Sequence, residues 1–96
     1  MKLKIKLRDG FKDDHVSIKV DGHEVYSKSG VSTDLSISFA DAVEIPVKDP
    51  SVKLNVTVDG TTEEKEIRVD KTPFVDVWRE GPSMELRESP DEVPML

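Results

Sequence analysis

The chain has no cysteine, few aromatic residues and no long run of apolar residues. Without cysteine it can form neither disulfides nor thiolate metal sites, and this absence favours a reducing compartment over secretion. The first ten residues, MKLKIKLRDG, lack the continuous apolar stretch of a signal peptide or a membrane span. We therefore expect a cytoplasmic protein with no membrane partner.

Basic residues are also scarce, since 14 Lys and Arg stand against 20 Asp and Glu, a net charge of −6 at pH 7. This excess of acid opposes general nucleic-acid binding. The charge is uneven: residues 1–30 carry seven Lys/Arg and five Asp/Glu, hence +2, whereas residues 31–96 carry seven and fifteen, hence −8. A local basic stripe is therefore possible within an acidic protein.

What the chain does have is a regular alternation of apolar and polar residues. In KLKIKLR, the apolar Leu3, Ile5 and Leu7 lie on one face of a strand and the basic residues on the other. The same period recurs in HVSIKV, DLSISF, VEIPV, VKLNVTV, EIRV, VDV and MEL. Turn-forming pairs such as Asp-Gly and Gly-Pro separate these segments. The pattern predicts an all-β, two-layer antiparallel sandwich of about seven to nine short strands.

Two Asp-Gly pairs predict β-hairpins, because Asp and Gly tolerate the positive φ of a tight turn. With Asp21-Gly22 as the first loop, the predicted pairs are Val20 with His23, Lys19 with Glu24 as an ion pair, and Ile18 with Val25. In this register His23 faces the core, whereas His15 faces outward, so the only two histidines cannot share a metal ion. In the second hairpin, a four-residue loop over residues 59–62 pairs Leu54 with Ile67.

The basic stripe formed by Lys2, Lys4, Lys6 and Arg8 has two interpretations. It could hold an anionic partner or phosphate groups. Lysines along an edge strand also prevent sheets from pairing edge to edge, and we prefer this second interpretation. Pro46 lies inside a strand pattern, which likewise places its strand at a sheet edge or at a bulge.

Neither a nucleophile nor a metal site is predicted. The stretch GVSTD lacks the second glycine of a nucleophile elbow, and Ser32 and Thr33 fit the start of a strand better. Asp9, Asp13 and Asp14 share one loop, but their spacing does not match an EF-hand. Aspartates in such positions usually form solvated turns. We expect no cofactor, no metal ion and no enzymatic activity.

The segment TPFVDVWREG carries the only tryptophan. If Val75 and Val77 face the core, then Phe74, Asp76 and Trp78 face outward. The opposite register would bury Asp76 between two aromatic rings, which is costly without a partner. Two aromatic side chains on an outer face form an apolar patch, and such patches typically mark an interaction site.

Either the chain covers this aromatic patch itself or a partner covers it. The C-terminal SPDEVPML contains two prolines, which favour an extended path. We expect residues 91–96 to pack back across the two aromatic rings, with Val93, Met95 and Leu96 as anchors. The candidate partner-binding residues are Phe74, Trp78, Met95 and Leu96.

Residues 14–78 resemble the small prealbumin-like sandwiches known as carboxypeptidase regulatory-like domains. The resemblance rests on VSIKV before a turn, a connection containing Ser32 and Thr33, and then a strand and a long hairpin. The family has aspartate-glycine after the threonine, whereas here Asp34 is followed by Leu35, which leaves an immunoglobulin-like topology open. The whole chain also resembles small stand-alone microbial proteins of no assigned function. The resemblance implies a non-catalytic accessory or interaction module.

The predicted organisation is a single sandwich domain over residues 1–88 and a tail over residues 89–96 that packs on it. The leading functional hypothesis is binding to another protein, as a monomer or a weak dimer. The alternative is a carbohydrate-binding module, in which Trp78, Phe74 and Tyr26 stack on sugar rings.

Overall fold

The computed structural model describes residues 1–92, which form eight β-strands and no helix. The strands are β1 (Lys2–Leu7), β2 (Asp14–Val20), β3 (His23–Val31), β4 (Asp41–Pro46), β5 (Ser51–Val58), β6 (Thr61–Arg68), β7 (Phe74–Glu80) and β8 (Ser83–Ser89). The all-β prediction is confirmed.

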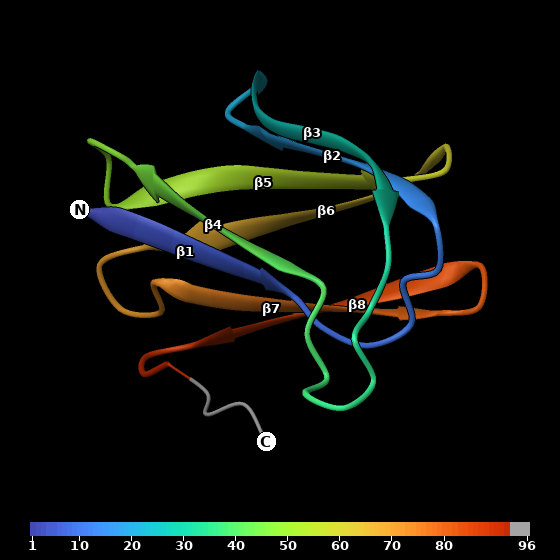
Figure 1. Ribbon diagram of the computed structural model, residues 1–96. Helices are drawn as coiled ribbons and strands as arrows, with labels where there is room; N and C mark the ends of the chain where they lie inside the picture. The colour runs from blue at the N-terminus through green and yellow to red at the C-terminus, as the bar shows by residue number, and fades with distance from the viewer. Residues whose placement is uncertain (93–96) are drawn as a thin grey trace.

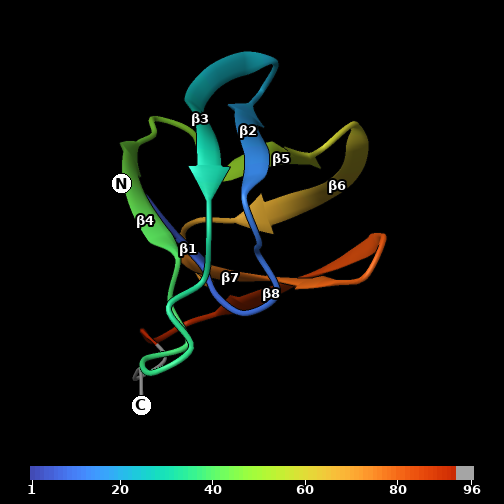
Figure 2. The same ribbon diagram turned by 45° about the vertical axis from the view of Figure 1, so that its right-hand side comes forward.

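The strands form two four-stranded sheets that pack on each other (Figures 1 and 2). Sheet A has the order β4-β1-β7-β8, and sheet B has the order β3-β2-β5-β6. All pairs are antiparallel except β1 with β7, which is parallel. The prediction of a purely antiparallel sandwich is therefore wrong at this pair. A long stretch of chain separates β1 from β7, so no hairpin turn forces them to run in opposite directions.

The core lies between the sheets, because alternate residues of each strand face inward. Leu3, Ile5 and Leu7 of β1 are fully buried, as are Val75 and Val77 of β7. Sheet B contributes Val16, Ile18, Leu54, Val56, Val58 and Ile67 to the same cluster. These positions are the ones that the alternation in the sequence predicts.

Both Asp-Gly pairs form tight two-residue turns, with φ of 50° at Asp21 and 82° at Gly22, and of 47° at Asp59 and 87° at Gly60. The four-residue loop predicted for the second hairpin is wrong, because Val58 pairs directly with Thr61. Ile67 therefore lies opposite Val52 instead of Leu54, a register shift of two residues. Because side chains alternate between the faces with a period of two, the apolar residues of both strands still lie on the same face.

In the first hairpin, Val20 pairs with His23 and Lys19 with Glu24 in the predicted register. The predicted ion pair does not form among residues 1–92, and the Glu24 carboxylate accepts from the Ser17 hydroxyl at 3.1 Å instead. A bulge then interrupts the pairing. Ile18 therefore pairs with Tyr26 and not with Val25. Because a bulge re-aims the side chains beyond it, Tyr26 can reach toward sheet A. His23 is exposed at the end of the hairpin, so the prediction that it faces the core is wrong.

The predicted strand DLSISF is also wrong, because residues 35–38 form turns. The carboxylate of Asp34 accepts hydrogen bonds from the backbone N–H and the hydroxyl of Ser36, and Ser38 has a φ of 51°. These side-chain bonds compete with a strand. Leu35 and Ile37 consequently lie in solvent, 82% and 43% exposed.

The residues before this loop do not start a strand either. The Thr33 hydroxyl donates to the Arg8 carbonyl at 2.6 Å and accepts from the Phe11 N–H at 3.1 Å. The Ser32 hydroxyl accepts from the Asp13 N–H at 2.8 Å. Both side chains therefore fasten the loop after β1 to the end of β3, and the prediction that they begin a strand is wrong.

The strand β1 is internal to sheet A, between β4 and β7, so the edge-protection interpretation of the basic stripe is wrong. Pro46 does end an edge strand, as predicted. The edges of the two sheets are joined by side chains on both sides of the molecule. Tyr26 of β3 donates to Asp41 of β4 at 2.7 Å, and Lys65 of β6 donates to the Leu86 carbonyl of β8 at 3.3 Å.

Candidate functional site

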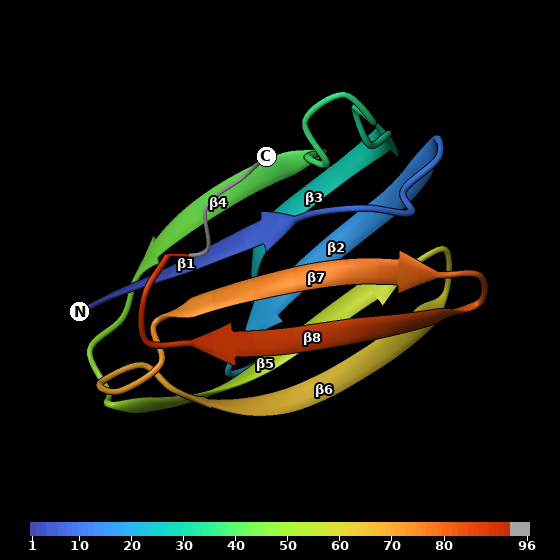
Figure 3. The same ribbon diagram turned by 90° about the horizontal axis from the view of Figure 1, so that it is seen from below.

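The outward-facing side of sheet A brings the basic stripe of β1 beside the aromatic residues of β7. Lys4 lies opposite Phe74 in the parallel register, and Lys6 lies opposite Asp76. Figure 3 views the molecule from this side, with β4, β1, β7 and β8 nearest the viewer. We call this side the outer face of sheet A.

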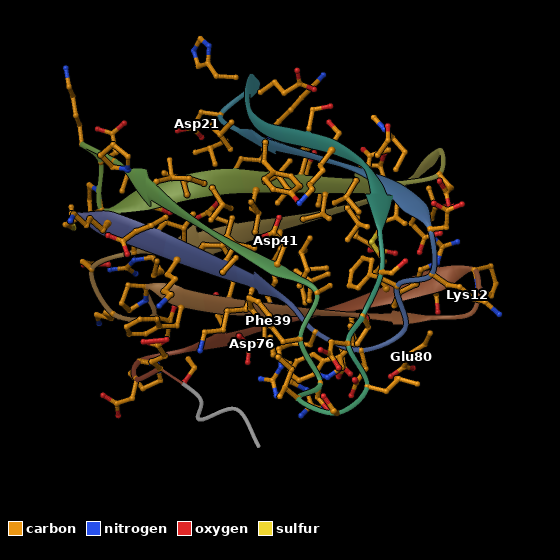
Figure 4. All side chains as sticks on the ribbon, viewed as in Figure 1. Lys12, Asp21, Phe39, Asp41, Asp76 and Glu80 are labelled. Atoms are coloured by element: carbon orange, nitrogen blue, oxygen red, sulfur yellow. The ribbon has the colours of Figure 1, made fainter. Side chains whose placement is uncertain are left out.

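The centre of the outer face is a buried ion pair. Arg8 Nη1 lies 3.0 Å from Asp76 Oδ2, and the two side chains are only 8% and 5% exposed. Arg8 Nε also donates to the Ser38 carbonyl at 3.0 Å, which ties the loop between β3 and β4 to this face. Asp76 faces outward as predicted, yet it is buried, and Arg8 is the partner that makes its burial possible. Figure 4 shows Asp76 on the side of β7 away from sheet B, with Asp21 at the opposite side of the molecule.

Trp78 is half-buried beneath two guanidinium groups. The Arg8 and Arg87 guanidinium carbons lie 5.4 Å and 5.3 Å from its ring centroid, within the range of cation–π attraction. Phe74 is half-buried as well. The two predicted partner-binding aromatics therefore share the outer face, with basic groups around them.

The chain after β8 turns back toward β1 across the start of β7 (Figure 3). Glu92 Oε2 lies 2.8 Å from both Lys4 Nζ and Lys6 Nζ. These two hydrogen bonds lower the pKa of Glu92 to about 2. The bond that Lys4 donates to Glu92 is in turn the main cause that raises the pKa of Lys4. The other predicted tail residues, Val93, Met95 and Leu96, lie outside the described residues, so their packing on the two aromatics stays a prediction.

Sequence reasoning missed the role of Glu92 in this site. The available signal was charge complementarity between an acidic tail and a basic stripe on an otherwise acidic chain. A row of lysines fits a sheet edge equally well, so the sequence alone does not identify the tail as their partner. Only the parallel pairing of β1 with β7 places the stripe next to the end of β8.

The aspartates considered for calcium lie at one end of the sandwich. Asp14 is buried, and Arg79 Nη1 lies 3.4 Å from its carboxylate and 3.2 Å from that of Asp59. The pKa of Asp14 is raised, mainly by burial and next by a hydrogen bond with Asp59. The same hydrogen bond is the main cause that lowers the pKa of Asp59. Within residues 1–92, no three His, Cys, Asp or Glu side chains are grouped to hold a metal ion. Here the guanidinium of Arg79 supplies the positive charge between the two carboxylates.

Two open cavities lie away from the outer face of sheet A. One, of about 210 Å³, opens between the sheets and is walled by Val20, Val25, Ile45, Val47 and Val52, with His23, Lys48 and Asp49 at its rim. The other, of about 350 Å³, lies beside Phe11 and the exposed Leu35. Both have mostly apolar walls, and neither includes a residue of the basic stripe.

No family model, curated protein or solved structure matches the chain. The part of the chain that the structure describes contains no helix long and apolar enough to cross a membrane. The interpretation of the site therefore depends on the geometry of the outer face of sheet A.

Proposed function

We propose that this chain is a non-catalytic β-sandwich module that binds another protein through the outer face of sheet A. The observation that carries this proposal is the binding of the Glu92 carboxylate by Lys4 and Lys6 beside Phe74. In this proposal the sandwich is prealbumin-like or immunoglobulin-like, and the protein acts in the cytoplasm as a monomer or a weak dimer.

Charge and aromatic content support a protein ligand. The outer face of sheet A concentrates Lys4, Lys6, Arg8 and Arg87 around two aromatic rings, in a chain whose net charge is −6. Aromatic residues and arginine are enriched at protein interfaces, and complementary charge steers partners together. A partner with an acidic segment fits both features.

The carbohydrate alternative receives less support from the same contacts. A sugar ring stacks on an open aromatic face, whereas the guanidinium groups of Arg8 and Arg87 already lie over Trp78. Tyr26, the third aromatic of that hypothesis, donates its hydroxyl to Asp41 at the junction of β3 and β4. A sugar would have to displace these groups before it could stack.

The proposal is tested by nuclear magnetic resonance with defined probes. Acidic, neutral and basic octapeptides and a glycan panel are titrated to millimolar concentration against the labelled chain. We expect only the acidic peptide to shift the amides of Lys4, Lys6 and Phe74 and the indole N–H of Trp78. Shifts that appear with a glycan, or with the acidic peptide only on sheet B, would contradict the proposal.

A substitution on each sheet supplies the matched control. Lys4→Gln removes a half-exposed cation from the outer face of sheet A and should abolish the shifts. Lys53→Gln removes an exposed lysine from the outer face of sheet B, where it lies 3.7 Å from Glu64, and should leave the shifts unchanged.

A further inference from the structure

The two lysines that bind Glu92 are held on a rigid support. Both belong to β1, which is paired along its length with β4 on one side and with β7 on the other. Their Nζ atoms meet the same oxygen of Glu92, each at 2.8 Å. Lys6 is buried, with a side chain only 5% exposed, whereas Glu92 is 43% exposed. The cationic half of this contact is therefore built into the sheet, and the anionic half lies at its surface.

The remaining basic residues of the outer face contact acids from the sheet itself. Lys2 pairs with Glu44 of β4 at 3.1 Å, Arg8 with Asp76 of β7 at 3.0 Å, and Arg87 with Glu85 of β8 at 3.0 Å. The carboxylate that contacts Lys4 and Lys6 comes instead from the segment that follows β8. This segment joins the sheet at the end of β8.

We propose that Lys4 and Lys6 form a carboxylate-binding site for an acidic segment of a partner protein, and that Glu92 is the internal ligand which the partner's carboxylate replaces. This inference rests on the proposed function, because it assumes that the outer face of sheet A is the binding face. It adds the chemical group that the site recognises and the residue that competes for it.

The physical chemistry favours exchange of one carboxylate for another. A buried ammonium favours an anion in contact with it, so replacing the Glu92 carboxylate by a second carboxylate is easier than removing the tail alone. Glu92 is 43% exposed and follows the last strand, so the exchange breaks no pairing between strands. Phe74 lies beside Lys4 in the register, which favours a partner with an apolar side chain next to the acidic residue.

The tether of the tail sets the size of the effect. A group on a short linker competes with an effective concentration of the order of millimolar. A partner segment in solution therefore has to outcompete Glu92, and its apparent affinity is lowered. Neutralising Glu92 should weaken this competition.

The test uses the full chain and the octapeptide SPDEVPML, which carries residues 89–96, as the probe. The Glu92→Gln variant should bind the peptide at least about tenfold more tightly than the unsubstituted chain. Glu92→Lys, which is repelled by the two lysines, should do the same. Asp91→Asn is the matched control, because it removes the same charge at the neighbouring position. The Asp91 side chain forms no ion pair within residues 1–92, so the peptide affinity of this variant should equal that of the unsubstituted chain. The peptide SPDQVPML should bind every variant at least about tenfold more weakly than SPDEVPML does.

The outcomes separate this inference from the proposed function. Equal peptide affinity in the unsubstituted chain and in both Glu92 variants would overturn the role of Glu92 while leaving the binding face intact. If no acidic peptide shifts the outer face in any variant, the proposed function itself fails. A dimer that Glu92→Gln converts to a monomer would show that the ligand is the tail of a second copy, and would overturn the partner proposal.

Discussion

The outer faces of the two sheets are built from the same alternation of polar and apolar residues, yet they differ in burial. On sheet B the outward side chains pair across neighbouring strands in solvent: Asn55 with Glu64 at 3.1 Å, and Thr57 with Thr62 at 2.7 Å. On sheet A the outward Lys6, Arg8 and Asp76 are buried. A charged residue in an alternating strand is therefore no guarantee of a solvated position.

The difference comes from segments that cover sheet A. The loop between β3 and β4 reaches it through the Ser38 carbonyl, and the tail reaches it through Glu92. The cross-strand pairs on sheet B come from neighbouring strands of the same sheet. A covered face with buried charges has a defined shape and specific partners for each group, and this distinguishes sheet A as the candidate binding surface.

The largest effect is expected from breaking the buried pair of sheet A. Asp76→Ala leaves the Arg8 guanidinium buried without its carboxylate, and should lower the free energy of unfolding by about 3–5 kcal/mol. For a domain of this size the melting temperature should fall by more than about 10 °C. Thermal and denaturant unfolding measure both quantities.

Sheet B supplies the control for this substitution. Glu64→Ala removes a carboxylate that is exposed and shared by Asn55 and Lys53, so the change should stay within about 0.5 kcal/mol. If Asp76→Ala and Glu64→Ala lowered the free energy of unfolding by similar amounts, the buried charges of sheet A would contribute no more to stability than the exposed charges of sheet B.

The second effect concerns the junction between the sheets. Tyr26→Phe removes the hydroxyl that donates to Asp41 at 2.7 Å, and a hydrogen bond to a charged group contributes about 1.5–3 kcal/mol. Burial would raise the pKa of Asp41, but the bonds from Tyr26 and the Ala42 N–H, with Lys28 nearby, hold it below its usual value. The loss of the Tyr26 hydroxyl should therefore also raise the pKa of Asp41.

Hydroxyl removal on the outer face of sheet B is the comparison for Tyr26→Phe. Thr57→Val breaks the exposed contact with Thr62 and should change the free energy of unfolding by less than about 0.5 kcal/mol. The carboxyl titration of Asp41, followed by nuclear magnetic resonance, should move upward only in Tyr26→Phe. An unchanged titration would show that the Tyr26 hydroxyl does not hold the carboxylate.

The sequence predicts more of the core than of the pairing between strands. Inward residues such as Ile18 and Val75 follow from alternation alone, because the period of a strand is two. The parallel pairing of β1 with β7 does not follow from the alternation, because no local pattern specifies which distant strands become neighbours. The turn at Asp34 does not follow from the pattern either, because DLSISF alternates like a strand and the bonds from Ser36 to the Asp34 carboxylate outweigh that alternation.

The candidate site likewise combines features that local alternation predicts with contacts that it does not predict. The outward direction of Phe74, Asp76 and Trp78 was predictable from the period of β7. The partners of these residues were not, since Arg8 comes from the other end of the chain. Long-range contacts of this kind depend on the order of strands in the sheet, which a local pattern does not contain.

A smaller effect is expected from pH at the tail. The Glu92 pKa is lowered from 4.5 to about 2 by its bonds to Lys4 and Lys6. A depressed carboxyl pKa means that the stabilisation is fully present above about pH 4.5 and is lost as the pH falls toward about 2. The side-chain carboxyl signal of Glu92 and the amide of Lys4 should titrate together in that window. A Glu92 midpoint near 4.5 would show that the carboxylate is not held by the lysines.

The smallest effect on stability should come from copying the lysine spacing onto sheet B. The double substitution Asn55→Lys and Thr57→Lys places two lysines on the outer face of β5 with the spacing of Lys4 and Lys6 on β1. Both positions already carry polar side chains in cross-strand contacts at the surface, so the free energy of unfolding should change by about 0.5 kcal/mol or less. We expect no binding of SPDEVPML to sheet B of this variant, measured by amide shifts in a Glu92→Gln, Lys4→Gln background, because exposed lysines are hydrated and mobile and no aromatic residue lies beside them. If the peptide did bind there as tightly as it binds sheet A of Glu92→Gln, the spacing of two lysines would suffice, and the burial of Lys6 and the neighbouring Phe74 would have no part in recognition.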